Sequence, residues 1–518
     1  MTPKPITLEE QKELLQADHL NARINVEPVG KHLGLNEAVA RGLKHNLDYR
    51  LKLMEQAIAF GIADLSNYDM LPKLAANAGY NYRNNYFITY ATGAETGNPS
   101  LSEPFISSAK DYAIGGLSLS WNLLDFGVSY FNAQQNADKI LVASERRRRS
   151  MHLLIQDIQA AYLRAASAQH IQSQLLKTIS DANQALGNSR KGEQDGLKSP
   201  LEALKFRKSL LDNVKILETI SQELASAMVD LNQLINQPPN AAYALENPDE
   251  IVPPFAFKQT AIEEFEIRAL AHNADLKESI YNARIAVLET RKSLLKLLPG
   301  LNLNIGPQAS SNTYYINKNW VEGAAQLSFN LWNLVTAPAA KRLSEANEEW
   351  VKHKRMMVQM ALIGQVYVAR QQLENAETLY LRSAEIDEVD TRIAIITSDK
   401  ENEGSVSDAE KVAANASAVI SKLRKHQALT QFFLASGKLQ STTGLEPDLD
   451  SLNSVSLEEL TNAIGKSFEQ WNSGKLPAVN LTMEVEHPVE SVVQIEEVVH
   501  ESTSKRQFKN TSKKAAKK

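Results

Sequence analysis

Apolar and polar positions along this chain change their spacing in a fixed order. Residues 33–71 carry apolar side chains at helical spacing, and the predicted helix ends just before Pro72. Residues 74–90 then alternate, with apolar even positions and mostly polar or small odd positions, which predicts a strand with one apolar face. Residues 112–123 alternate in the same way, so we expect a hairpin (74–123) with a long polar loop over 91–111.

A long helix follows this predicted hairpin. Between residues 126 and 190 there is no proline, and the apolar positions recur every 3.5 residues on average, which is the spacing of a coiled-coil seam. At about 1.5 Å per residue such a helix would be ~100 Å long. The Gly/Ser/Pro-rich segment 192–200 predicts a chain reversal into another helix over 201–236.

The same order of elements occurs a second time. Residues 35–80 align without a gap on 262–307, and fourteen of the 46 pairs are identical. A second block aligns at an offset of 208 and pairs LSWNLLD (119–125) with LSFNLWN (327–333). The second copy predicts a hairpin over 301–331, a long helix over 338–398 that starts at Pro338, a break over 399–408 and a helix over 409–438.

Two tandem copies of one unit therefore make up most of the chain. We expect an N-terminal extension (1–32), a first repeat (33–240), a linker (241–260), a second repeat (261–447) and a low-complexity tail (448–518). Within the tail, residues 456–471 predict a short amphipathic helix with Ser456 as its N-cap.

Composition excludes several classes of function. The chain has no cysteine, which excludes disulfides, thiolate metal sites and cysteine nucleophiles. Its 56 Lys+Arg and 61 Asp+Glu leave no broad basic field, which argues against a nucleic-acid partner. No phosphate-binding glycine loop, zinc-binding HExxH motif or catalytic constellation is present, so we expect no enzyme activity, no catalytic residues, no cofactor and no metal site.

The predicted strands suggest a membrane barrel rather than a soluble core. The chain contains no run of 18 or more apolar residues, which a membrane-spanning helix would need. The first thirty residues also lack the apolar core of a secretory signal. However, alternating strands of about ten residues with aromatic ends are typical of outer-membrane barrels. Four strands cannot close a barrel, and open strand edges are not tolerated in lipid, so several chains would have to combine. The alternative is a soluble coiled-coil scaffold with small hairpins packed on it.

The duplicated order of motifs resembles the TolC outer-membrane efflux family over residues 33–447. The motifs that carry the resemblance are LPKL (71–74), LPGL (298–301), WNLLDFG (121–127) and the turns at Gly196 and Gly404. The resemblance implies an α+β, mainly α fold, in which long coiled-coil helices form an α-helical barrel. It also implies that four strands per chain build a twelve-stranded transmembrane β-barrel in a homotrimer.

The resemblance also implies location, partners and function. The barrel would lie in outer-membrane lipid and the tunnel in the periplasm, where it would meet a periplasmic adaptor protein and an inner-membrane pump. Such a trimer would be a passive exit duct for small toxic compounds or polypeptides, in a tripartite efflux or type I secretion system. No nucleic-acid partner is implied.

Candidate functional residues lie at both ends of the expected tunnel. By position after the tip turns, the resemblance makes Glu410 and Glu202 candidates for an acidic gate, although an acidic residue that complements a helix dipole is the alternative. An outer aromatic girdle is expected from the aromatic residues near the strand ends, with packing in a soluble hairpin as the alternative. Its candidates are Tyr80, Tyr82, Tyr86, Tyr90, Tyr314, Tyr315 and Trp320. The four cations at 146–149 point all around a helix, so we expect them to pair with nearby acids.

Overall fold

The computed structural model describes residues 3–90, 92, 94–99, 103–194, 200–254, 260–402, 408–447 and 456–479. The chain divides into two units, 1–476 and 477–518, and the elements below belong to the first. In chain order they are α1 (Leu8–Asn21), β1 (His32–Leu33), α2 (Leu35–His45), α3 (Leu47–Tyr68), β2 (Lys73–Tyr82), β3 (Phe87–Thr89), β4 (Phe105–Ser108), β5 (Asp111–Asn122), α4 (Leu123–Gln194), α5 (Pro200–Ala225), α6 (Ala227–Leu234), β6 (Ala244–Leu245), the 3₁₀ turn η1 (Pro248–Glu250), α7 (Ile262–His272), α8 (Ala274–Leu295), β7 (Gly300–Ser310), β8 (Asn319–Ser328), α9 (Trp332–Asn402), α10 (Asp408–Thr443) and α11 (Leu457–Asn472). No helix in the described ranges is both long and apolar enough to cross a membrane.

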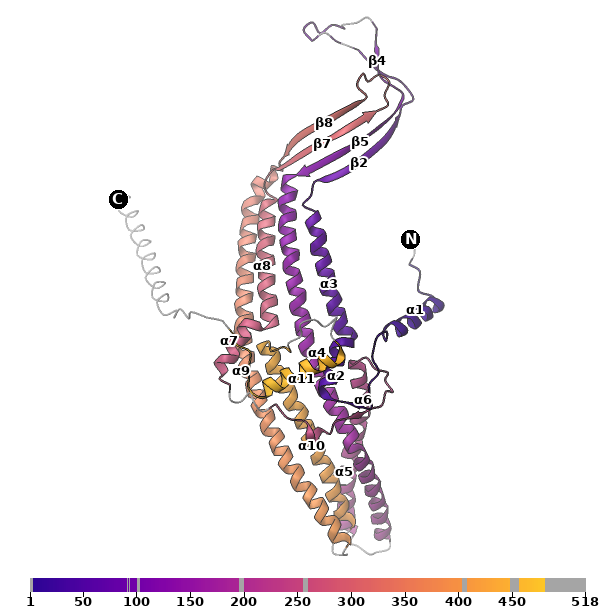
Figure 1. Cartoon of the computed structure of the whole chain (residues 1–518), viewed down its shortest axis with the longest axis vertical. Helices are drawn as coiled ribbons and strands as arrows, with labels where there is room; N and C mark the ends of the chain where they lie inside the picture. Colours follow the sequence, from indigo (N-terminus) through magenta and orange to yellow (C-terminus); the bar gives the residue numbers. More distant parts are fainter. Residues whose placement is uncertain are drawn as a thin grey trace, which may run out of the picture. The chain divides into compact units, whose positions relative to one another are not determined.

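Two long helices dominate the structure, as the 3.5-residue spacing predicted. α4 has 72 residues and α9 has 71, which corresponds to about 110 Å each. Below the strand sheet in Figure 1, α3, α4, α8 and α9 run side by side. The repeat is visible in the element bounds, because α2 and α7 differ by the sequence offset of 227, as do α3 and α8.

The single helix predicted over 33–71 is wrong, because the chain breaks at Asn46. Asn46 has an extended backbone, and its side chain accepts a hydrogen bond from the Tyr49 amide and donates one to the Leu234 carbonyl at 3.0 Å. Asn273 does the same in the second repeat, where it accepts from the Leu276 amide and donates to a carbonyl of α10 at 3.0 Å. The asparagine caps one helix and ties it to another, which stabilises a break that apolar spacing does not reveal.

The strand predicted over 74–90 is also shorter than expected. β2 ends at Tyr82. One more backbone hydrogen bond follows, from the Arg83 amide to the Lys110 carbonyl at 2.7 Å. The chain then bends, and β3, which covers the last part of the predicted strand, pairs with β4 in a separate two-stranded sheet. β4 lies in the region predicted as a loop. Alternation therefore continues across the bend although the hydrogen-bonded ladder does not.

The helix predicted to start at Pro338 begins earlier. α9 starts at Trp332, whose amide donates to the Asn330 side chain at 3.1 Å, and Pro338 lies inside the helix. The repeat counterpart of Asn330 is Asn122, which accepts from the amides at the start of α4 at 2.9 and 3.1 Å. The same residue type thus caps both long helices, so the transition does not depend on proline.

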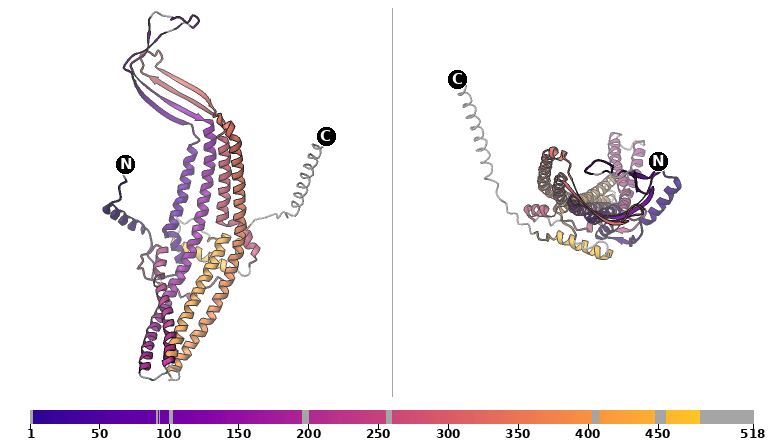
Figure 2. Two further views of the ribbon diagram at one scale, coloured as in Figure 1. Left: turned by 180° about the vertical axis from the view of Figure 1, so that it is seen from behind. Right: turned by 90° about the horizontal axis from the view of Figure 1, so that it is seen from above.

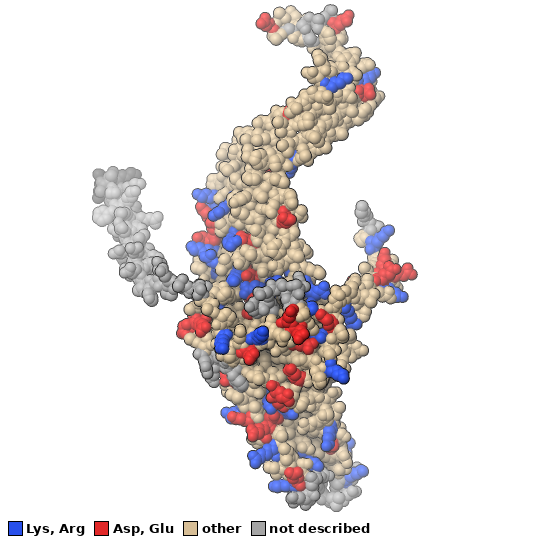
Figure 3. Space-filling model, viewed as in Figure 1, with Lys and Arg blue, Asp and Glu red and all other residues tan. Residues whose placement is uncertain are grey.

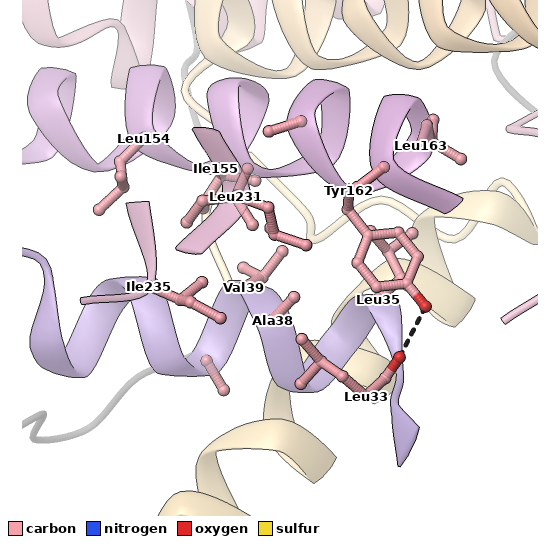
Figure 4. Close-up of a cluster of buried hydrophobic side chains, with 14 of the residues drawn as sticks. Leu33, Leu35, Ala38, Val39, Leu154, Ile155, Tyr162, Leu163, Leu231 and Ile235 are labelled. Atoms are coloured by element: carbon pink, nitrogen blue, oxygen red, sulfur yellow. Dashed lines mark hydrogen bonds between the residues drawn. The ribbon is translucent and has the colours of Figure 1, made fainter. Parts of the chain in front are cut away.

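The main apolar core lies at mid-length of α4, where α2 and α6 pack against it (Figure 4). The Tyr162 hydroxyl is fully buried and donates to the Leu33 carbonyl at 2.8 Å. α11, which the sequence assigned to the tail, has the predicted capping box at Ser456 and buries Leu460 and Ile464 in this core.

The four long strands form one antiparallel sheet in the order β2-β5-β7-β8. Each strand is joined to one helix, which precedes β2 and β7 and follows β5 and β8. The helices pack in the matching order α3-α4-α8-α9. The strands curve and twist instead of lying flat, as Figures 1 and 2 show. The sheet and the upper helices are thus one continuous wall that has β2 and α3 at one margin and β8 and α9 at the other.

Candidate functional site

The four-stranded sheet has one apolar face that no described part of the chain covers. The register places Leu74 beside Leu119, and Leu119 beside Ile305, so apolar side chains of neighbouring strands form rows. Leu74 is 71% exposed and Leu327 is 69% exposed, at opposite margins of the sheet. On the side shown in Figure 3, charged residues are scarce over these strands and gather on the helices. A face of this kind is unfavourable in water.

The opposite face of the same sheet is polar. Asn77 lies opposite Gly116, Ser120 lies opposite Asn304, and Asn302 lies opposite Gln326. The polar and apolar faces predicted for the separate strands are therefore aligned across all four strands. A sheet of this kind suits an apolar medium on one side and water on the other.

Both margins of the sheet end in strands with one unpaired edge. Within the described ranges, β2 pairs only with β5, and β8 pairs only with β7. β2 has 10 residues and β8 has 10, so each margin leaves a long row of unpaired backbone groups. The two marginal strands run in opposite directions, because the sheet consists of four strands and each is antiparallel to its neighbour. Copies of this sheet can therefore join edge to edge.

The marginal helix α3 exposes apolar side chains at coiled-coil spacing. They are Leu47, Leu51, Met54, Ile58, Ile62 and Leu65. On the other marginal helix, α9, Leu343, Trp350 and Met357 are exposed seven residues apart. Stripes with this period pack against another helix in a coiled coil.

The internal repeat allows the helix contacts at the two margins to be compared with the equivalent contacts inside the chain. α4 packs against both α3 and α8. Its repeat counterpart α9 packs against α8, the counterpart of α3, and against α7 and α10, but among the described residues no counterpart of α8 packs against α9. The α4–α8 contact includes a Gln135–Glu289 hydrogen bond of 2.9 Å. The repeat counterparts of these two residues are the exposed Leu343 and Ile62. The margins therefore have the geometry of a helix contact without the second helix.

The candidate girdle residues do not all lie on one face of the sheet. Tyr80 and Tyr82 are exposed on the apolar face near the end of β2, whereas Tyr86 and Tyr90 lie beyond that strand. Tyr314 and Tyr315 lie in the connection between β7 and β8. Trp320 pairs with Gln308 and so lies on the polar face, where its ring contacts Tyr315 with 6.1 Å between centroids. The register therefore does not bring Trp320 together with Tyr80 and Tyr82.

The candidate tip residues lie at the far ends of the long helices. Glu410 is exposed in the first turn of α10. Glu202 lies in the first turn of α5, but its side chain is outside what the structure describes. Gly196 and Gly404 also fall outside the described residues.

Three of the four consecutive arginines pair with acids, as predicted. Arg146 pairs with Glu278 at 2.8 Å and Arg149 with Asp275 at 3.0 Å, and both pairs link α4 to α8. Arg148 is largely buried and contacts Glu446 at 2.5 Å. Burial alone would raise the pKa of Glu446, but hydrogen bonds from His152 and Arg148 lower it to about 2. These pairs join the two repeats within one chain.

Comparison with solved structures identifies the fold. The chain is similar to the Campylobacter jejuni CmeC outer membrane channel, with a TM-score of 0.61 and 13% identity, over 84% of this chain and 89% of that one. It is similar to the outer-membrane channel OprN, with a TM-score of 0.60 and 14% identity, over 79% and 89%. It is also similar to the open state of the Neisseria gonorrhoeae MtrE outer membrane channel, with a TM-score of 0.57 and 16% identity, over 80% and 91%. No family model and no curated protein matches the sequence.

Proposed function

We propose that this chain, which has the fold of the TolC-like outer-membrane channels, is one protomer of a homotrimeric channel-tunnel. Four strands from each of three chains would form a twelve-stranded barrel in outer-membrane lipid. The helices would continue this barrel as a tunnel in the periplasm. The duct would be passive and would export small toxic compounds or polypeptides, as part of a tripartite efflux or type I secretion system.

The exposed two-faced sheet is the observation that carries this proposal. Its strands have 10 to 12 residues, which is about the length needed to cross a bilayer at a tilt. Lipid would cover the apolar face, and the polar face would line a water-filled lumen. In lipid the free edges of β2 and β8 would be costly, so they require pairing with further chains. The soluble scaffold would instead leave the apolar face in water.

The lower end of the tunnel would meet the other components of the system. We place the contacts with a periplasmic adaptor and an inner-membrane pump at the tip, where α4 turns into α5 and α9 turns into α10. Three copies of Glu410 around a three-fold axis would repel one another and attract cations. We therefore propose Glu410 as the main candidate for an electrostatic gate and Glu202 as the second candidate.

Membrane fractionation tests the proposal. The full chain, expressed with a functional export signal, should sediment with the outer membrane as a sarkosyl-insoluble trimer that heat converts into monomers. The purified trimer should conduct ions in planar lipid bilayers. A species that remains soluble and monomeric without detergent would refute the channel and favour the scaffold.

A further inference from the structure

We propose that Glu322 in β8 of one protomer forms an ion pair with Arg83 of the neighbouring protomer, and that this pair fixes the register between chains. The inference rests on the proposed trimeric channel, because it needs the free edge of β8 to meet the free edge of β2 from the next chain. It goes further by specifying which residues face each other at that joint.

The internal repeat allows the register of the joint to be worked out. β7 is the counterpart of β2 at an offset of 227, and β8 is the counterpart of β5 at an offset of 208. These offsets reproduce a known pairing, because Ala78 opposite Gly115 in the first hairpin becomes Ile305 opposite Gly323 in the second. The two hairpins therefore share one register, and the offsets are valid for the sheet.

The contact between β5 and β7 is the template for the joint between chains. Applying the offsets turns the β5–β7 contact into a contact between β8 and the next β2. The observed pair Ile114–Ser310 then becomes Glu322 opposite Arg83 of the neighbouring protomer. The observed pair Gly116–Gln308 becomes Ala324 opposite the neighbour's Asn81.

The two faces of the sheet provide an independent check on this register. Leu327 on the apolar face would lie opposite Ala78, which is also on the apolar face. Ser328 on the polar face would lie opposite the polar Asn77. A slip by one residue would place apolar side chains on the polar face, which period-two alternation forbids.

Charge supports the pair at the position where the register places it. The four long strands contain three charged residues. Lys73 and Asp111 are the first residues of their strands, and Glu322 is the one that lies in the interior of a strand. In the described part of one chain, the carboxylate of Glu322 has only a long contact of 3.5 Å with the Trp320 ring nitrogen. Arg83 lies over the Phe87 ring at 4.8 Å, and no carboxylate in the described residues pairs with it. Among the residues that the structure describes, neither charge thus has an oppositely charged partner within its own chain.

Within the chain, the positions equivalent to this pair are Ile114 and Ser310, which are uncharged. The ion pair would therefore mark the joint between chains and not the joint within a chain. Opposite charges placed directly across two strands favour one register over its alternatives.

Cysteine crosslinking of outer-membrane trimers tests the register. The sequence has no native cysteine, so every disulfide must form between the introduced residues. We expect the pair Ala324→Cys and Asn81→Cys to give disulfide-linked dimers and trimers after mild oxidation, because directly opposite residues lie at disulfide distance. The matched control combines Ala324→Cys with Asn77→Cys, on the same strands and face but four residues further along, about 14 Å away. It should crosslink at least tenfold less, and each single-cysteine chain should still form trimers.

A charge swap tests the ion pair itself. Arg83→Glu and Glu322→Arg should each lower the fraction of heat-resistant trimer about threefold or more, and the double swap should restore most of it. Efficient crosslinking of the shifted control, or a double swap no better than the single variants, would overturn the inference while leaving the channel proposal intact. Absence of an outer-membrane trimer from the unmodified chain would instead refute the proposed function.

Discussion

Gly79 offers the sharpest test of how the protomers join. In one chain its position is open, since a Cβ added there would meet only the Ile114 side chain at 3.6 Å. Its repeat counterpart Gly306 is crowded, because a Cβ there would lie 1.9 Å from the carbonyl oxygen of Leu117 on the adjacent strand. If the next protomer approaches β2 as β5 approaches β7, Gly79→Ala should leave the single chain folded and block assembly.

The size of the effect follows from this geometry. The 1.9 Å approach is more than 1 Å shorter than normal contact, so the strands must separate. Overpacking of this kind costs about 1–3 kcal/mol at each site, and three joints per trimer give about 3–9 kcal/mol. We expect Gly79→Ala to lose most of the heat-resistant trimer on gel electrophoresis, while circular dichroism of the detergent-solubilised chain shows unchanged helix content.

Two glycines of the same sheet serve as controls. Gly115→Ala should assemble normally, because its added Cβ would meet only a carbonyl oxygen at 3.5 Å. Gly306→Ala should damage the chain itself, because its crowding partner is in the same chain. Gly79→Ala trimers that resist heat as well as the unmodified trimers would show that the next protomer does not approach β2 in this way.

Three further changes test other parts of the molecule. Glu446→Gln should destabilise the fold by about 3 kcal/mol at neutral pH, because the lowered pKa of this carboxylate contributes to the free energy of unfolding. This contribution is present above about pH 4.5 and is lost as the pH falls towards 2. Denaturant titrations measure it, and an unchanged midpoint would contradict the prediction. Asn273→Ala removes both a helix cap and a buried hydrogen bond to α10, so thermal unfolding should show a loss of about 2 kcal/mol. Glu410→Gln should weaken cation block in single-channel recordings, and unchanged conductance and block would remove Glu410 from the gate.

The sequence predicted the long elements well because they depend on local periodicity. A 3.5-residue spacing over many turns predicts a long helix, and α4 and α9 have the expected character. The break at Asn46 was missed because the bond that stabilises it reaches the Leu234 carbonyl, 188 residues away in the chain. Its repetition at Asn273 was the available signal, since an asparagine shared by both copies is a natural cap.

By itself the sequence determined the duplication, the apolar and polar face of each strand, and the order of the elements. These features follow from side-chain alternation and repeat offsets, which are properties of short segments. The sequence also predicted the two hairpins, but only the tertiary structure decided that β5 pairs with β7 and in which register the strands pair, because alternation with a period of two fits any even shift equally well. That register separates Trp320 from the tyrosines of β2 and leaves β2 and β8 as free edges. Hydrogen bonds between distant segments determine the register, and the pattern within one segment cannot encode it.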